Sequence, residues 1–225
     1  MSARSAPTAA SLSFGAGLSA HADAGRAGAD AARQAAAGLA AQNAASADLA
    51  LVFFSQHHLD DFATVVDAAR AELSPGCLIA VSAESVLGGA TELEGAPGVS
   101  VLAARLPGVA ITPFTSERIA PVDDSTDGLA RLAQAIGAGD DLAATLLFAD
   151  PFSMPMVRML PALNRCRVET AEQGPHGVIL GGMASAARQP GQNVLVLDDR
   201  VLRMGAVGVS LSGAVRVASV VSQGC

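Results

Sequence analysis

Apolar residues along this chain alternate between two spacings, one typical of strands and one typical of helices. Leu12, Phe14 and Ala16 are separated by small residues, as in a short strand, whereas Val65, Val66, Ala69 and Leu73 recur at helical spacing. The pattern predicts further strands at 48–55, 78–83, 99–105, 109–114 and 143–149, and helices at 23–42, 60–73, 128–137 and 155–163. Strands and helices therefore interleave through the first two-thirds of the chain.

The last part of the chain is mostly strand in its pattern. Short apolar runs at 176–183, 193–197, 201–203, 206–212 and 215–222 are separated by turn residues, as in a meander. Residues 106–108, Leu-Pro-Gly, are predicted to turn the 99–105 and 109–114 strands into a hairpin. The mixture indicates an α+β or mixed α/β fold, with mixed or antiparallel sheets flanked by helices. Two packed sheets with helices outside them are one such arrangement.

Residues 1–10 are Ala, Ser, Pro and Thr with one Arg, and we expect them to form a disordered lead-in. The remaining residues, 11–225, are enough for one domain with a substantial core. Hydrophobic residues make up 51% of the chain but aromatic residues only 3%, so this core must consist of Ala, Val, Leu and Ile.

Charge excludes one class of partner. The formal net charge is −7 and all basic side chains are Arg, so the chain lacks the basic surface that a nucleic acid requires. The mean hydropathy of +0.41 is high, yet the most apolar stretches are only as long as strands. We therefore predict no membrane span. Three widely spaced cysteines without metal-ligand spacing indicate a reducing, cytoplasmic location.

Two local motifs suggest ligand chemistry, and both have a simpler explanation. Residues 15–20 fit G-x-G-x-x-A after a strand, but the acid expected after the second strand of a dinucleotide fold is missing, which favours an ordinary strand of small residues. His57 and His58 precede Asp60 and Asp61, but too few ligands converge there for zinc, and either Asp is a suitable helix cap. His57 remains a ligand candidate because loops at strand ends hold ligands in such folds.

The sequence predicts no metal site, no cofactor and no catalytic residue. The acidic residues Asp123, Asp124 and Asp127 lack the spacing of a calcium loop. Cys77 and Cys166 suit a role as small apolar core residues, because no neighbouring base or positive charge would activate a thiolate. Cys225 differs, since Gln223 and Gly224 beside it offer hydrogen-bond donors.

Glycine clusters end the apolar runs of the last fifth of the chain. The segments 181–185 (Gly-Gly-Met-Ala-Ser), 205–213 and 222–225 (Ser-Gln-Gly-Cys) resemble, in order and spacing, the blocks of FIST-domain proteins, a sensory family named for F-box and intracellular signal transduction. Residues 51–58, 78–93 and 97–102 resemble earlier blocks of the N-terminal FIST domain. Where that family carries a Gly-Cys-Ser/Thr element, this chain has Ala80-Val81-Ser82, which removes a thiol but keeps Ser82.

The resemblance implies a domain that senses small molecules such as amino acids. It also implies a C-terminal FIST domain beyond residue 225, or another signalling partner, and we expect self-association through the C-terminal strands without it. The predicted ligand-binding residues are Gly181, Gly182, Met183, Ala184, Ser185, Gln223, Gly224, Cys225, His57 and Ser82. Backbone amides at the glycines, with Ser185 and Gln223, would bind carboxylate or carbonyl groups.

Two alternatives to a sensory domain stay open. One is a thiol or amide hydrolase, with Cys225 in an active site that a second domain completes. The other is a scaffold that binds proteins and no small ligand.

Overall fold

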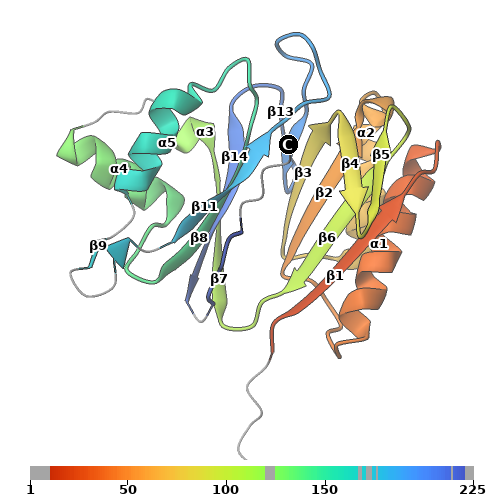
Figure 1. Cartoon of the computed structure of the whole chain (residues 1–225), viewed down its shortest axis with the longest axis horizontal. Helices are drawn as coiled ribbons and strands as arrows, with labels where there is room; N and C mark the ends of the chain where they lie inside the picture. Colours follow the sequence, from red (N-terminus) through yellow and green to blue (C-terminus); the bar gives the residue numbers. More distant parts are fainter. Residues whose placement is uncertain are drawn as a thin grey trace, which may run out of the picture.

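The computed structural model describes residues 11–119, 125–166, 169–170, 174–175, 177–213 and 215–220. Two β-sheets pack face to face, and helices cover the outer face of each sheet, so the molecule has four layers (Figure 1). The predicted mixed α/β class, with two packed sheets and helices outside, is confirmed.

The first sheet has the strand order β1-β6-β2-β3-β12-β13. Its strands are β1 (Ser13–Ser19), β6 (Val99–Arg105), β2 (Leu49–Ser55), β3 (Cys77–Ala83), β12 (Leu195–Leu197) and β13 (Arg200–Leu202). β2 and β3 are parallel, and the other neighbours are antiparallel. A hairpin of β4 (Ser85–Gly88) and β5 (Thr91–Glu94) follows β3.

Two helices cover the outer face of this sheet. In α1 (Ala24–Ala40), Asp23 caps the first turn by accepting a hydrogen bond from the backbone N–H of Arg26. The backbone of α1 lies so close to β1 that a Cβ atom on Gly17 would be 2.0 Å from the carbonyl oxygen of Ala31. The glycines of the G-x-G-x-x-A motif therefore allow helix packing, which is the simpler of the two explanations. The second helix, α2 (Phe62–Leu73), follows the 3-10 turn η1 (Gln56–His58).

The second sheet has the order β11-β8-β14-β7. Its strands are β11 (Val178–Met183), β8 (Leu142–Ala149), β14 (Ala206–Gly213) and β7 (Val109–Thr115), and α3 (Ser116–Ile119), α4 (Thr126–Ile136) and α5 (Met156–Arg165) cover it. β8 and β11 are parallel, whereas β14 is antiparallel to both of its neighbours. A small pair, β9 (Glu169–Thr170) and β10 (Gly174–Pro175), lies outside this sheet.

Alternate residues of the strands supply the two sides of each sheet. In β2, Ala50, Val52 and Phe54 face the helices, whereas Leu49 and Leu51 join the core between the sheets. This inter-sheet core contains side chains from β3, β12, β8 and β14, among them Ile79, Leu195, Val207 and Val209.

Three expectations about strand organisation were wrong. β6 and β7 do not form a hairpin, because β6 pairs with β1 and β2 while β7 pairs with β14 in the other sheet. Leu106, between them, is buried in the inter-sheet core, so the turn carries the chain from one sheet to the other. The closing strands form no meander, since β12 and β13 belong to the first sheet and β11 and β14 to the second. Residues 215–220 form no strand, and residues 221 and 222 lie outside the described part.

Among the described residues, no helix is long and apolar enough to cross a membrane.

Candidate functional site

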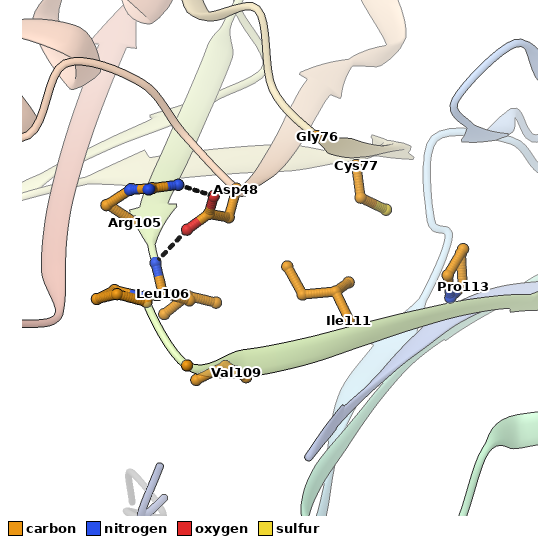
Figure 2. Close-up of a pocket in the computed structure, with 10 residues that line it drawn as sticks. Asp48, Gly76, Cys77, Arg105, Leu106, Val109, Ile111 and Pro113 are labelled. Carbon is orange, nitrogen blue, oxygen red and sulfur yellow. Dashed lines mark hydrogen bonds and ion pairs between the residues drawn. The ribbon is translucent and has the colours of Figure 1, made fainter. Parts of the chain in front are cut away.

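A cavity of about 420 Å³ opens between the two sheets, at the end where β2 and β3 begin. Asp48, Gly76, Cys77 and Arg105 line it from the first sheet, and β7 forms the opposite wall (Figure 2). The turn at residues 106–108, which carries the chain from one sheet to the other, also lines the cavity.

An ion pair stands at this cavity. The guanidinium of Arg105, the last residue of β6, pairs with Oδ1 of Asp48, the residue before β2 (Figure 2). The other carboxylate oxygen of Asp48 accepts a hydrogen bond from the backbone N–H of Leu106 at 2.6 Å. The side chains of Asp48 and Arg105 are 25% and 42% exposed, so both charged groups remain in contact with solvent.

Backbone hydrogen bonds fix the position of Asp48. Its N–H donates to the carbonyl of Ala104 at 2.7 Å, and its carbonyl accepts from the N–H of Cys77 at 2.9 Å. Gly76 packs close to it, because a Cβ on Gly76 would lie 3.1 Å from the Asp48 carbonyl oxygen. The carboxylate is thus held on two neighbouring strands rather than on a free loop.

The remaining walls are mostly apolar. Leu106, Val109, Ile111 and Pro113 supply aliphatic surface, and the Cys77 side chain points toward the same space (Figure 2). The arrangement combines one cationic group, one anionic group and an apolar volume. It can hold a small molecule that carries both charges on one side and an aliphatic group on the other.

The Cys77 thiol is not a nucleophile at neutral pH. Burial, followed by the negative charge of Asp198, raises its pKa from 9.0 to about 12, and the opposing effect of Arg70 is smaller. The side chain is only 4% exposed. The prediction that Cys77 serves as a small apolar core residue agrees with this environment.

Of the predicted ligand residues, segment 181–185 and Ser82 lie at the other end of the sandwich. Gly181, Gly182 and Met183 are in β11, and the backbone N–H of Ser185 donates to the carbonyl of Ser82 at 3.1 Å. The Ser185 hydroxyl oxygen accepts a hydrogen bond from the N–H of Glu84. Segment 181–185 thus reaches Ser82 through Ser185, away from the inter-sheet cavity, and a role of these residues in ligand binding stays a prediction.

A buried polar network ties the two sheets together beside Ser82. The Ser82 hydroxyl donates to Oδ1 of Asn193 at 3.4 Å, and Nδ2 of Asn193 donates to Oδ1 of Asp150 at 3.0 Å. The other oxygen of Asp150 accepts from the Ser153 hydroxyl at 2.6 Å. Ser82, Asn193 and Asp150 are all 0% exposed, so the Ser82 hydroxyl is hydrogen-bonded inside the protein.

The two histidines have different surroundings. His57 is exposed after β2, with Nδ1 3.5 Å from the Ser55 hydroxyl. His58 is buried, and burial, followed by the charge of His57, lowers its pKa. Asp61 occupies the N-cap position of α2 without a side-chain capping bond. Gln223, Gly224 and Cys225, as well as Asp123 and Asp124, lie outside the described residues.

Comparison with known proteins identifies the family. The FIST N domain matches residues 48–225, a range that starts at Asp48 and includes every residue of the cavity. The chain belongs to the FIST N domain family. This domain is described as a sensory domain of signalling proteins.

Similar proteins extend the likeness to the strand and helix that precede Asp48. An uncharacterized protein of Mycobacterium tuberculosis (strain CDC 1551) is 33% identical over 214 residues, which are 95% of this chain and 51% of that protein. An uncharacterized protein of Mycobacterium bovis is 31% identical over 217 residues, again 95% of this chain and 51% of its own length. This FIST N domain chain thus spans about half the length of the curated relatives it matches.

The sequence reasoning missed the pair of Asp48 and Arg105. They stand 57 residues apart and become neighbours only because β6 lies antiparallel beside β2. The available signal was a charged residue at the outer end of each of two apolar strands, which is also the pattern of an ordinary strand terminus.

Proposed function

We propose that this FIST N domain senses a small amphiphilic metabolite, and that the ligand binds in the inter-sheet cavity beside Asp48 and Arg105. The observation that carries the proposal is the ion pair at a cavity whose opposite wall, on β7, carries aliphatic side chains. Zwitterionic amino acids with aliphatic side chains are the ligand class that fits best.

The two charges of the pair suit the two charged groups of such a ligand. In the bonds described here Arg105 uses only Nη1, which leaves guanidinium donors for a ligand carboxylate. Each Asp48 oxygen accepts one described hydrogen bond and has a further lone pair for an ammonium group. The aliphatic side chain would then contact Ile111 and Val109 on β7.

This location gives a route from binding to signalling. A ligand that contacts Asp48 and Arg105 on one sheet and β7 on the other stabilises one distance between the sheets. A ligand shifts the equilibrium between two conformations only if it binds one of them more tightly. A ligand that contacts both sheets would bind most tightly at one separation of the sheets, so its binding would favour the conformation with that separation.

The experiment is a thermal-shift screen with leucine, isoleucine, valine and methionine, and with 4-methylpentanoate and isopentylamine, which carry one charge each. At about 100 times the dissociation constant, binding adds about 2.7 kcal/mol, or a shift on the order of 5 °C for this size. We expect the amino acids to raise Tm and the singly charged analogues to do so much less.

Variants locate the ligand. Arg105→Gln removes the cavity cation and is expected to abolish the shift, whereas Arg200→Gln removes a surface cation paired with Glu117 and should leave it unchanged. The segment 181–185 remains the alternative location, with Gln223–Cys225, and Ser185→Ala tests it. A shift lost in Ser185→Ala and retained in Arg105→Gln would place the ligand there and refute the cavity.

A further inference from the structure

The two sheets have four edge strands, namely β1 and β13 in the first sheet and β11 and β7 in the second. An edge strand presents unpaired backbone N–H and C=O groups, and it pairs readily with another strand unless a charge, a proline, a short length or a covering side chain prevents this. The four strands differ sharply in such protection.

Two glutamines block β1. The Gln42 amide accepts from the N–H of Phe14 at 3.2 Å and donates to its carbonyl, and Gln34 forms the same two bonds with Leu18. Gln34 lies in α1 and Gln42 lies just after its C-terminal end, and both side chains take the place of a neighbouring strand.

Simpler devices protect two other edges. Pro113 stands in the middle of β7 and has no N–H to offer to a further strand. β13 is only three residues long and carries the charged Arg200.

β11 has none of these features. Its six residues, VILGGM, include no charge and no proline. Gly181, Gly182 and Met183 are exposed, and a Cβ on Gly182 would meet no atom within 4 Å. Across the residues that the structure describes, no strand pairs with its free side.

Apolar surface flanks the same edge. A hollow of about 390 Å³ lies between β11 and α5, lined only by aliphatic side chains, methionines and glycines. Met183 and Leu160 beside it are 41% and 39% exposed, and Val157, one turn before Leu160 on α5, is 90% exposed. An open edge thus lies next to an uncovered apolar patch.

We propose that β11 pairs antiparallel with β11 of a second copy of this chain, which joins the two second sheets into one continuous sheet. A two-fold axis at the β11 edge places the apolar patch between β11 and α5 of one copy against the same patch of the other copy. The interface is therefore formed by the same surface on both subunits. Each copy carries a net charge of −7, and this patch, free of charged residues, is where two copies approach with little repulsion. Gly182, where an added Cβ would meet no atom within 4 Å, leaves the approaching backbone unobstructed.

Sedimentation equilibrium of the full chain tests the pairing. We expect the wild type to approach twice 22.4 kDa with rising concentration. Gly182→Lys puts a charge on the open edge where a side chain has room, and should raise the dimer dissociation constant at least tenfold. Val157→Asp on the neighbouring helix should do the same.

Leu87→Lys is the matched control, because Leu87 is 67% exposed on the β4–β5 hairpin, in the other sheet layer. It should dimerise as the wild type does. Hydrogen exchange adds a local readout, with β11 amides slowing as concentration rises while those of β7 do not. A wild type that stays monomeric, or a Gly182→Lys variant with unchanged self-association, overturns the proposal. So does dimerisation that Leu87→Lys abolishes.

Discussion

Single side chains differ in chemistry here mainly through burial. Cys77 and His58 are both buried, and burial disfavours the charged form of each, which raises the pKa of Cys77 and lowers the pKa of His58. Asp150 is equally buried, but two hydrogen-bond donors, Asn193 and Ser153, satisfy its carboxylate. Each environment gives a measurable expectation.

Cys77 should be inert to thiol reagents in the folded protein. With a pKa of about 12, only about one thiol in ten thousand is ionised at pH 8. In a Cys225→Ser variant, the remaining thiols should react with iodoacetamide far more slowly in buffer than in urea. Fast labelling of Cys77 at pH 8 in the folded state would contradict the buried environment.

His58 should make folding sensitive to acid. Its pKa is lowered from 6.5 in the folded state, so the unfolded chain binds the proton more tightly, and the unfolding free energy falls as pH drops below about 6.5. The charges around it are His57, which lowers the pKa further, and Asp61 and Asp23, which oppose the shift. His58→Asn should flatten the dependence between pH 6.5 and 5, measured by urea unfolding, whereas His57→Asn should retain it.

The Asp150–Asn193 contact should tolerate exchange but not single replacement. Asp150→Asn leaves one of two donors without an acceptor, and Asn193→Asp puts two carboxylates together in the core, so each should cost about 1–3 kcal/mol or more. The double exchange restores every donor–acceptor pair and should recover most of the loss in urea unfolding. Additive destabilisation would show that the network does not act as described.

Strands and helices themselves could largely be predicted from the sequence, whereas their partners could not. The spacing of Val65, Val66, Ala69 and Leu73 predicts α2 because helical periodicity is local. Pairing is not local: β6 and β7 read as a hairpin although Leu106 between them is buried between two sheets. The same limit prevented the sequence from predicting the pairing of Asp48 with Arg105. Glycine clustering singled out segment 181–185, whose Ser185 bonds to Ser82, and a ligand-binding role for these residues stays a prediction.

The close packing of α1 on β1 predicts how much a substitution between them lowers the stability of the protein. Gly17→Ala would place a methyl group 2.0 Å from the carbonyl oxygen of Ala31, so helix and strand must separate, at a cost of roughly 1–3 kcal/mol. Gly182→Ala, where the added atom meets nothing within 4 Å, should change stability by less than about 0.5 kcal/mol. Equal effects of the two substitutions on urea unfolding would contradict this packing.

For the molecule as a whole, the two ends of the sandwich have different roles. At the end where β3 finishes, Ser82, Asn193 and Asp150 lock the sheets together. At the opposite end the sheets leave a cavity of about 420 Å³ with a charged pair beside it. The ligand proposed above would therefore bind at the end where fewer polar contacts hold the sheets together among the described residues.

The most direct test of this account is a two-dimensional amide NMR titration of the isotopically labelled chain with leucine. The account predicts that the shifts concentrate at Asp48, Cys77 and the residues from Arg105 to Val109, and that Arg105→Gln removes them. Saturable shifts confined to residues 181–185 and Ser82, with none at Asp48 or Arg105, would contradict it.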